Sequence, residues 1–233
     1  MNDLHSYGFG NSSSINSLAI RNRVLRNTYA LLALSMVPTI LGAWIGVAMH
    51  LSLFAASPFI GFIVFMAVAF AFFWAIEKNK DNGLGVILLL GFTFFMGVML
   101  SRLVGHTLHS YSNGATLIML AFGGTAAIFA VMATIATVSK SDFSGLGKWL
   151  LVGILLIIVA SLANAWLQMP SLMLTVMVLA IAIFSAFILV DVQRVVSGGE
   201  TNYIMATLAI YLDVYNVFSN LLALLGIFGG DRD

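Results

Sequence analysis

The chain has 233 residues, of which 61% are hydrophobic and only 8% are charged. Soluble domains carry about 25% charged residues, so this composition indicates an integral membrane protein and excludes a soluble protein with one core. The net charge of +1 offers no surface for nucleic acid, and the absence of cysteine excludes disulfides, thiolate metal sites and cysteine nucleophiles.

Seven apolar stretches follow one another along the chain, each near the roughly 20 residues that a membrane-spanning helix needs. The first four cover about 24–49, 54–76, 84–104 and 115–138. Residues 149–190 carry no charge and are too long for one helix. Pro170 disfavours helix at the residue before it, so "LQMPS" is predicted to separate the fifth span from the sixth. The seventh span runs from about 202 to 228.

The predicted fold class is all-α, because the apolar runs are continuous, whereas strands of a membrane barrel alternate over about ten residues. Residues 21–233 are expected to form a single seven-helix transmembrane domain. Residues 1–20 are polar and lack the charged start and cleavage site of a signal peptide, so they are predicted to be a disordered tail. Gly42 and Gly46 form a GxxxG pattern, a weak indication of close helix packing.

Basic residues are distributed unequally between the two sides of the predicted spans, eight against two. The eight are Arg21, Arg23, Arg26, Lys78, Lys80, Lys140, Lys148 and Arg194, and the two are Arg102 and Arg232. Positive residues concentrate on the cytoplasmic side of membrane proteins. The N-terminus and the loops at Lys78, Lys140 and Arg194 are therefore predicted to be cytoplasmic and the C-terminus to lie outside.

Asp213 is the only Asp, Glu, Lys, Arg or His between Thr201 and Gly230. A charge at mid-bilayer costs about 2.5 to 3.5 kcal/mol on insertion scales, so such a residue normally faces the bundle interior, a partner or water. At 100° per residue it shares one stripe with small and polar residues: Asn202, Ala206, Ala209, Asn216 and Asn220. This stripe predicts a helix that lines a hydrated path. Alternatively, Asn216 and Asn220 form hydrogen bonds between helices and Asp213 is a neutral core acid.

Asp191 ends the apolar run of the sixth span, where two interpretations are open. A local ion pair with Arg194, three residues later, is one of them. In the other, the short connection after the sixth span makes the last two spans an antiparallel hairpin that permits Asp191 and Asp213 to approach. Both carboxyl groups cannot stay charged close together in a poorly solvated bundle, so such a pair would share one proton near neutrality.

His106 and His109 lie on one helix face at the outer end of the third span, one turn after Arg102. Their spacing permits a metal site or a pH response. Alternatively, the two histidines are only solvated polar side chains at a helix end in the membrane interface. The chain contains no HExxH, GxxxxGKS or GxGxxG pattern. We therefore expect no enzymatic activity and no resident cofactor.

Four segments resemble the Bax inhibitor (transmembrane Bax inhibitor motif) family, most closely its bacterial YccA branch. They are "VLRNTY" at 24–29, "GGT" at 123–125, "FILVDVQRVVSGGETNYIMAT" at 187–207 and "YLDVYNVFSNLLALLG" at 211–226. The resemblance implies a bacterial inner-membrane protein whose seventh helix is central. It also implies that two acids, matching Asp191 and Asp213, form a pH-responsive latch over a cation path, chiefly for calcium. For this branch it implies binding to, and restraint of, the membrane-anchored AAA+ protease FtsH.

Two functions, which are not exclusive, therefore remain open. The first is a regulator that occupies the protease, with Asn2 to Ile20 as the unstructured handle that a processive protease needs. The second is a pH-sensitive leak for calcium, other cations or protons through the bundle. Its predicted residues are Asp191, Arg194, Asp213, Asn216 and Asn220.

Overall fold

The computed structural model describes residues 9–50 and 58–231 and, within these ranges, contains seven α-helices. In chain order they are α1 (Phe9–Ala48), α2 (Pro58–Lys78), α3 (Gly83–Ser110), α4 (Gly114–Val138), α5 (Leu146–Leu167), α6 (Pro170–Ser197) and α7 (Tyr203–Gly229). All seven are long and apolar enough to cross a membrane. The predicted all-α class and the seven spans are confirmed.

The predicted break between the fifth and sixth spans lies where the sequence placed it. Gln168 ends α5 in the left-handed conformation, and Pro170 is the first residue of α6. Proline suits this position because its missing N–H would have no partner in the first helical turn. The two apolar helices can therefore follow each other with a connection of only two residues.

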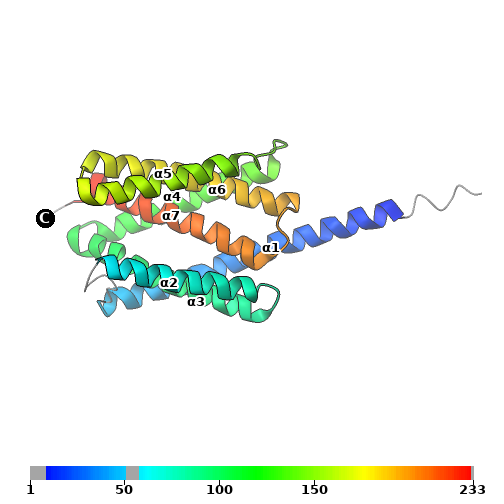
Figure 1. The fold of residues 1–233 in the computed structure, drawn as a ribbon, viewed down its shortest axis with the longest axis horizontal. Coiled ribbons are helices and arrows are strands. Elements are labelled where there is room, and N and C mark those ends of the chain that lie inside the picture. The colour runs from blue at the N-terminus through cyan, green and yellow to red at the C-terminus, as the bar shows by residue number, and fades with distance from the viewer. Residues whose placement is uncertain (1–8, 51–57, 232–233) are drawn as a thin grey trace, which may run out of the picture.

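α1 is longer than predicted, because it begins at Phe9 and continues for 40 residues. Its first part extends out of the bundle (Figure 1). The structure thus differs from the predicted disordered tail over residues 9–20, whereas residues 1–8 lie outside the described ranges. Residues 9–20 contain no proline, and extending an existing helix needs no new nucleation.

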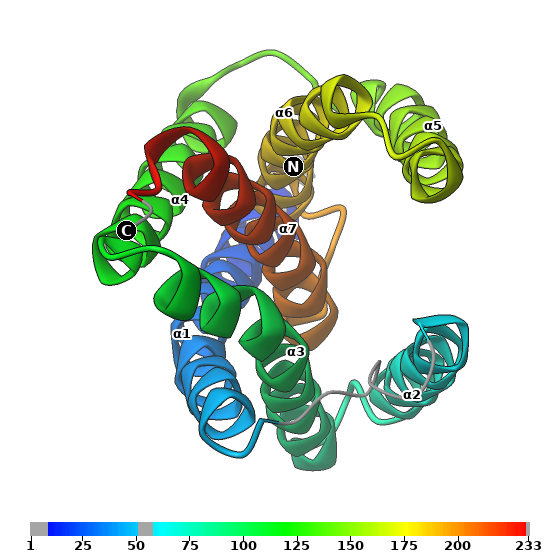
Figure 2. The same ribbon diagram turned by 90° about the vertical axis from the view of Figure 1, so that its left-hand side faces the viewer.

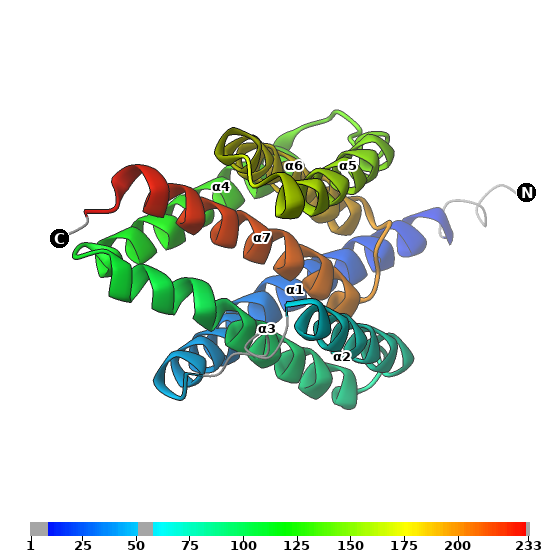
Figure 3. The ribbon, with the colours of Figure 1, turned by 60° about the vertical axis from the view of Figure 1, so that its left-hand side comes forward.

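α7 is central, as predicted: it contacts α1, α2, α3, α4 and α6. Viewed end-on, it lies among these helices (Figure 2). α2 and α3 lie on one side of it and α5 and α6 on the other (Figure 3). α5 contacts only α6 among the described helices and has no buried residue, so it faces the surroundings of the bundle.

The backbones of α1 and α3 approach each other closely at several glycines. A Cβ atom on Gly97 would collide with the backbone carbonyl oxygen of Thr39, and one on Gly42 would collide with that of Phe94. Gly46 similarly faces the side chain of Ser101. The GxxxG pattern of Gly42 and Gly46 therefore lies at a helix contact, where small residues let two backbones approach.

Candidate functional site

Asp213 lies inside the bundle, on the face of α7 that packs against α6. Its side chain is buried, with 6% of the residue exposed. Among the described residues, its Oδ2 atom has no hydrogen-bond partner. A buried polar atom without a partner is costly and rare in folded proteins. Asp213 is therefore a candidate for a functional group rather than a packing element.

The structure brings Asp191 and Asp213 together, which the sequence only permitted. Their carboxyl groups lie close enough to act on each other electrostatically. Gly198 ends α6 in the left-handed conformation, and α7 then returns along α6 as the predicted hairpin. An ionised carboxylate only accepts hydrogen bonds, so a hydrogen bond between the two groups would require one of them to carry a proton.

Arg194 also contacts Asp191, so the two interpretations of that acid are both present in one structure. The Arg194 Nη1 and Asp191 Oδ1 atoms are 3.7 Å apart. The arginine side chain is 56% exposed, and ion pairs with an exposed partner contribute about 0 to 1 kcal/mol. Glu200, after the end of α6, also acts electrostatically on Asp191. The acid pair thus has one positive and one negative neighbour on the loop side.

Asn216 and Asn220 lie on α7 beyond Asp213 and are half-buried. Their side-chain amides donate to backbone carbonyl oxygens one turn earlier, those of Leu212 and Asn216, both at 2.8 Å. These donors are therefore bonded within α7 rather than to a neighbouring helix. This differs from the interhelical hydrogen bonds that were one expectation for the two asparagines.

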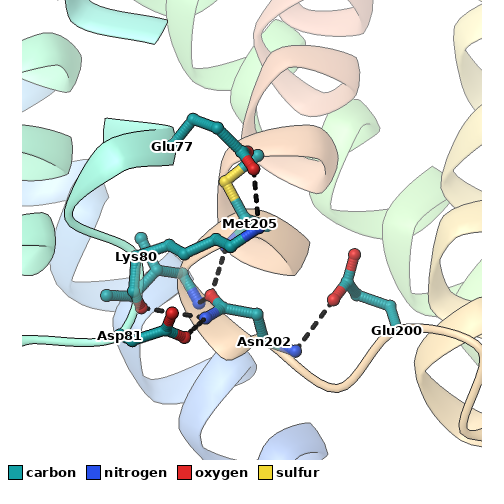
Figure 4. Close-up of polar contacts among 7 residues, drawn as sticks. Glu77, Lys80, Asp81, Glu200, Asn202 and Met205 are labelled. Atoms are coloured by element: carbon teal, nitrogen blue, oxygen red, sulfur yellow. Dashed lines mark hydrogen bonds and ion pairs between the residues drawn. The ribbon is translucent and has the colours of Figure 1, made fainter. Parts of the chain in front are cut away.

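Asn202 has a structural role instead of a place on the polar stripe. It is the N-cap of α7, where its Oδ1 atom accepts hydrogen bonds from the backbone N–H groups of Ile204 and Met205. Its Nδ2 atom donates to Lys80 O at 2.8 Å and to Asp81 Oδ1 at 3.0 Å (Figure 4). The start of α7 is thereby fixed to the turn between α2 and α3.

Gln193, which the sequence reasoning missed, fixes a second loop to the same end of the bundle. Its Oε1 atom accepts from the Phe143 backbone N–H at 2.7 Å, and its Nε2 atom donates to Ser141 O at 2.6 Å. All three loops predicted to be cytoplasmic therefore meet around the end of α6 and the start of α7. A polar residue just after the uncharged run that ends at residue 190 was the only signal for this contact.

Comparison with known proteins relates nearly the whole seven-helix chain to one protein family. The family model described as "Inhibitor of apoptosis-promoting Bax1" matches residues 21–230. The chain belongs to the Bax inhibitor family. This family membership confirms the resemblance inferred from the four sequence segments, and the seven apolar helices make the chain a multi-pass membrane protein.

Several bacterial relatives of this family member match it over nearly their whole length. A protein of Neisseria meningitidis serogroup A is 36% identical over 213 residues, which cover 91% of this chain and 93% of the relative. The "Modulator of FtsH protease YccA" of Escherichia coli K12 is 33% identical over 217 residues, covering 92% and 94%. A membrane protein of Vibrio cholerae is 32% identical over 226 residues, covering 96% and 97%.

At the opposite end of this Bax inhibitor family bundle, His106 and His109 line a small pocket of about 200 Å³ together with His50 and Arg102. The Nδ1 atom of His106 lies 3.1 Å from the Ser110 hydroxyl. Within the described ranges, no group of three or more His, Cys, Asp or Glu side chains is arranged to hold a metal ion. Three histidines are thus brought together with an arginine, but among the described residues they are not arranged to hold one metal ion.

Proposed function

We propose that this protein is an inner-membrane regulator that binds and restrains an FtsH-type, membrane-anchored AAA+ protease. The observation that carries the proposal is the 33% identity, over 92% of this chain, with an E. coli protein named as a modulator of that protease. An E. coli O6:H1 protein named "Inner membrane protein YccA" is also 33% identical to the chain over 217 residues, which supports a location in the inner membrane. The seven helices joined by short loops suit a partner protein that acts by occupying the protease within the membrane.

The N-terminal segment, Asn2 to Ile20, supplies the handle in this proposal. The part of it that the structure describes belongs to α1 and extends from the bundle on the side predicted to be cytoplasmic (Figure 1). A processive protease starts on a chain end that it can grip and unfold, and a helical extension outside the bundle is easier to unfold than the packed helices.

The test combines binding with degradation in cells that carry the protease. Full-length protein is expected to co-purify with the protease and to slow the degradation of a known membrane substrate. Deleting Asn2 to Ile20 is expected to lengthen the half-life of the protein, because the segment that the protease grips is removed. Binding is expected to be retained, because the seven-helix bundle is still present. Failure to co-purify above the level of an unrelated seven-helix protein, with unchanged substrate turnover, would reject the proposal.

A second candidate function, a pH-sensitive leak for calcium or other cations, is favoured by the contact between Asp191 and Asp213. A proton shared between the two carboxyl groups would tie α6 to α7. Losing it would make the groups repel, whereas a second proton would remove the negative charge that attracts a cation. Arg194 and Glu200 are the charged neighbours that would modulate this balance.

Purified protein in liposomes tests this second function through calcium and proton flux measured across pH. Asp191→Asn and Asp213→Asn keep volume and hydrogen-bonding capacity but remove titration, so each is expected to abolish the pH dependence of flux. Arg194→Gln serves as the comparison, because it removes the exposed ion pair and keeps both acids. Absence of flux above empty vesicles would leave the regulatory function alone, and an unchanged pH profile in Asp213→Asn would make the acids structural.

A further inference from the structure

Three histidines and an arginine meet in one pocket between the ends of α1 and α3. Arg102, His106 and His109 follow one another at helical spacing, so they lie on one face of α3. His50 comes from the other helix, just after α1 ends at Ala48. Both helices end on the side of the bundle opposite the N-terminal extension of α1 (Figure 1). These four side chains define the histidine pocket.

The packing of α1 against α3 brings His50 to the other three side chains. A Cβ atom on Gly46 would collide with the Ser101 side chain. One on Gly105 would meet the Val47 side chain at 3.5 Å. One turn further along α1, His50 has a left-handed backbone with a φ of 50°, a conformation that glycine usually adopts after a helix. Tertiary packing therefore places this histidine, whereas histidines that are merely solvated at one helix end need no contribution from a second helix.

The histidine pocket offers hydrogen-bond donors without an acid to pair with them. Among the described residues, neither Asp nor Glu lines it, and no acid forms an ion pair with Arg102. Ser101 donates its hydroxyl hydrogen to the Val98 carbonyl oxygen at 2.6 Å. The Nδ1 atom of His106 lies 3.1 Å from the Ser110 hydroxyl, which leaves its Nε2 atom for a ligand. Exposed, positively charged donors of this kind attract an anion.

The arginine decides between a metal ion and an anion. Imidazole nitrogens are common metal ligands, but the fixed positive charge of Arg102 beside them opposes a cation. Within the described ranges, the histidines are also not arranged to hold a metal ion. A guanidinium presents a planar fork of N–H donors that matches carboxylate and phosphate oxygens, and a protonated imidazole donates from both nitrogens. The chemistry of the pocket therefore favours an oxyanion.

The depth of the pocket in the membrane identifies the class of oxyanion. Arg102 lies about 29 Å along α3 from its start at Gly83, at 1.5 Å per residue. The hydrocarbon core of a bilayer is about 30 Å thick, so Arg102 reaches the headgroup level on the far side, where phospholipids carry their phosphates. We propose that the histidine pocket binds a phosphate group at the outer membrane surface, from a phospholipid headgroup or from free phosphate, through Arg102 and the three histidines.

Histidine NMR of the full chain tests this proposal, because the chain has four histidines and gives a simple spectrum. The protein is purified in an uncharged detergent without phosphate, at about pH 6, where histidine side chains carry protons. His50→Gln, His106→Gln and His109→Gln each remove one signal and thereby assign it. One arm titrates inorganic phosphate and the other phosphatidylglycerol. Sodium chloride at equal ionic strength and a diacylglycerol with the same acyl chains are the comparisons.

The three assigned signals are expected to shift and saturate in at least one of the two phosphate arms. Saturation with phosphatidylglycerol alone identifies a lipid headgroup as the ligand, and saturation with inorganic phosphate alone identifies free phosphate. No saturable shift in either arm would overturn the proposal, as would an equal shift with sodium chloride or diacylglycerol. A response to Zn²⁺ without any response to phosphate would also overturn it, because the pocket would then be a cation site.

Variants of Arg102 separate the pocket from a general effect of surface charge. Arg102→Gln is expected to weaken binding by about tenfold or more, because charge-assisted hydrogen bonds to the phosphate are lost. Arg102→Lys keeps the charge without the planar fork, so it should recover part of the affinity. Lys148→Gln removes the same charge from an exposed residue at the end predicted to be cytoplasmic, and it should bind like wild type.

Equal affinity of wild type and Arg102→Gln would contradict the proposal, and so would an equal loss in Lys148→Gln. Arg102 is exposed, so its variants are expected to fold, which size-exclusion chromatography checks. If a variant does not fold, the wild-type titrations against sodium chloride and diacylglycerol still decide the question.

Discussion

The side-chain amide of Asn202 donates a hydrogen bond to the backbone carbonyl oxygen of Lys80, with 2.8 Å between the two atoms. The same side chain caps α7 through its oxygen, which accepts from the backbone N–H groups of Ile204 and Met205. Beside it, Lys80 donates to Glu77 at 2.6 Å, and this bond raises the pKa of the lysine (Figure 4). One residue therefore both starts the central helix and positions it against α2 and α3.

Asn202→Ala is expected to lower the free energy of unfolding by about 2 kcal/mol, because it removes the cap and the tie to Lys80 together. Asn202→Thr keeps a capping oxygen, so it should recover about half of the loss. Ser197→Ala, in the same connection, removes only an exposed bond to Arg194 O and should stay within about 0.5 kcal/mol of wild type. Chemical unfolding in detergent measures all three, and equal stability of Asn202→Ala and Ser197→Ala would contradict this role.

Asn202 also shows where sequence periodicity stops being informative. The 100° rule placed it on one stripe with Asp213, but it is the N-cap, and helical spacing does not apply to a residue outside the helix. Its position before an apolar run is a capping signal that could have identified it. The seven spans were predictable because the bilayer sets their length. The break at Pro170 was predictable because proline disfavours a helical backbone at the residue before it.

The sequence could not establish that Asp191 and Asp213 lie close together. The acid contact depends on how far α6 and α7 are rotated and shifted relative to each other, which many side-chain contacts decide together. The side chain of Gln193 likewise finds its partners 50 and 52 residues away.

Asp142, in the loop between α4 and α5, should titrate below the ordinary aspartate range. Its carboxylate accepts hydrogen bonds from the Ser144 backbone N–H at 2.9 Å and from the Ser144 hydroxyl at 3.0 Å, and both lower its pKa. Because the pKa is lowered in the folded state, the stabilisation is present above the unfolded value of about 3.9. It is lost as pH falls through the lower folded value, so the turn is intact at neutral pH.

Carboxyl carbon NMR of the folded protein measures this titration. Ser144→Ala removes the hydroxyl donor and keeps the backbone donor, so the pKa of Asp142 is expected to move part of the way back up. Ser141→Ala is the control, since the Ser141 side chain has no role in these two bonds. A pKa of Asp142 that does not respond to Ser144→Ala would show that the hydroxyl bond does not persist in solution.

The C-terminus is expected outside the cytoplasm. Asp231 is held at the turn between α3 and α4, where its backbone N–H donates to Asn113 Oδ1 at 3.1 Å. This end of the bundle is opposite the loops at Lys80 and Lys140 (Figure 1). A reporter enzyme that is active only outside the cytoplasm should be active when fused after Asp233 and inactive when fused after Lys140. The reverse pattern, with normal expression of both fusions, would invert the orientation inferred from the basic residues.

Alanine at Gly97 and alanine at Gly123 are expected to change stability in opposite directions. A Cβ atom on Gly97 would collide with the Thr39 carbonyl oxygen, which belongs to a helix backbone and cannot move unless α1 separates from α3. Overpacking of this kind costs about 1 to 3 kcal/mol, and the shift would also disturb the hydrogen bond between Thr39 and Tyr211.

Gly123→Ala is the matched control on α4, because its Cβ atom would meet nothing within 4 Å. Alanine is favoured over glycine in a helix by about 1 kcal/mol, so this variant should equal or exceed wild type in stability. Chemical unfolding of both variants in the same detergent gives the comparison, and Gly42→Ala should follow Gly97→Ala because it meets the carbonyl oxygen of Phe94. If Gly97→Ala were as stable as Gly123→Ala, the backbones of α1 and α3 could not be as close as the structure places them.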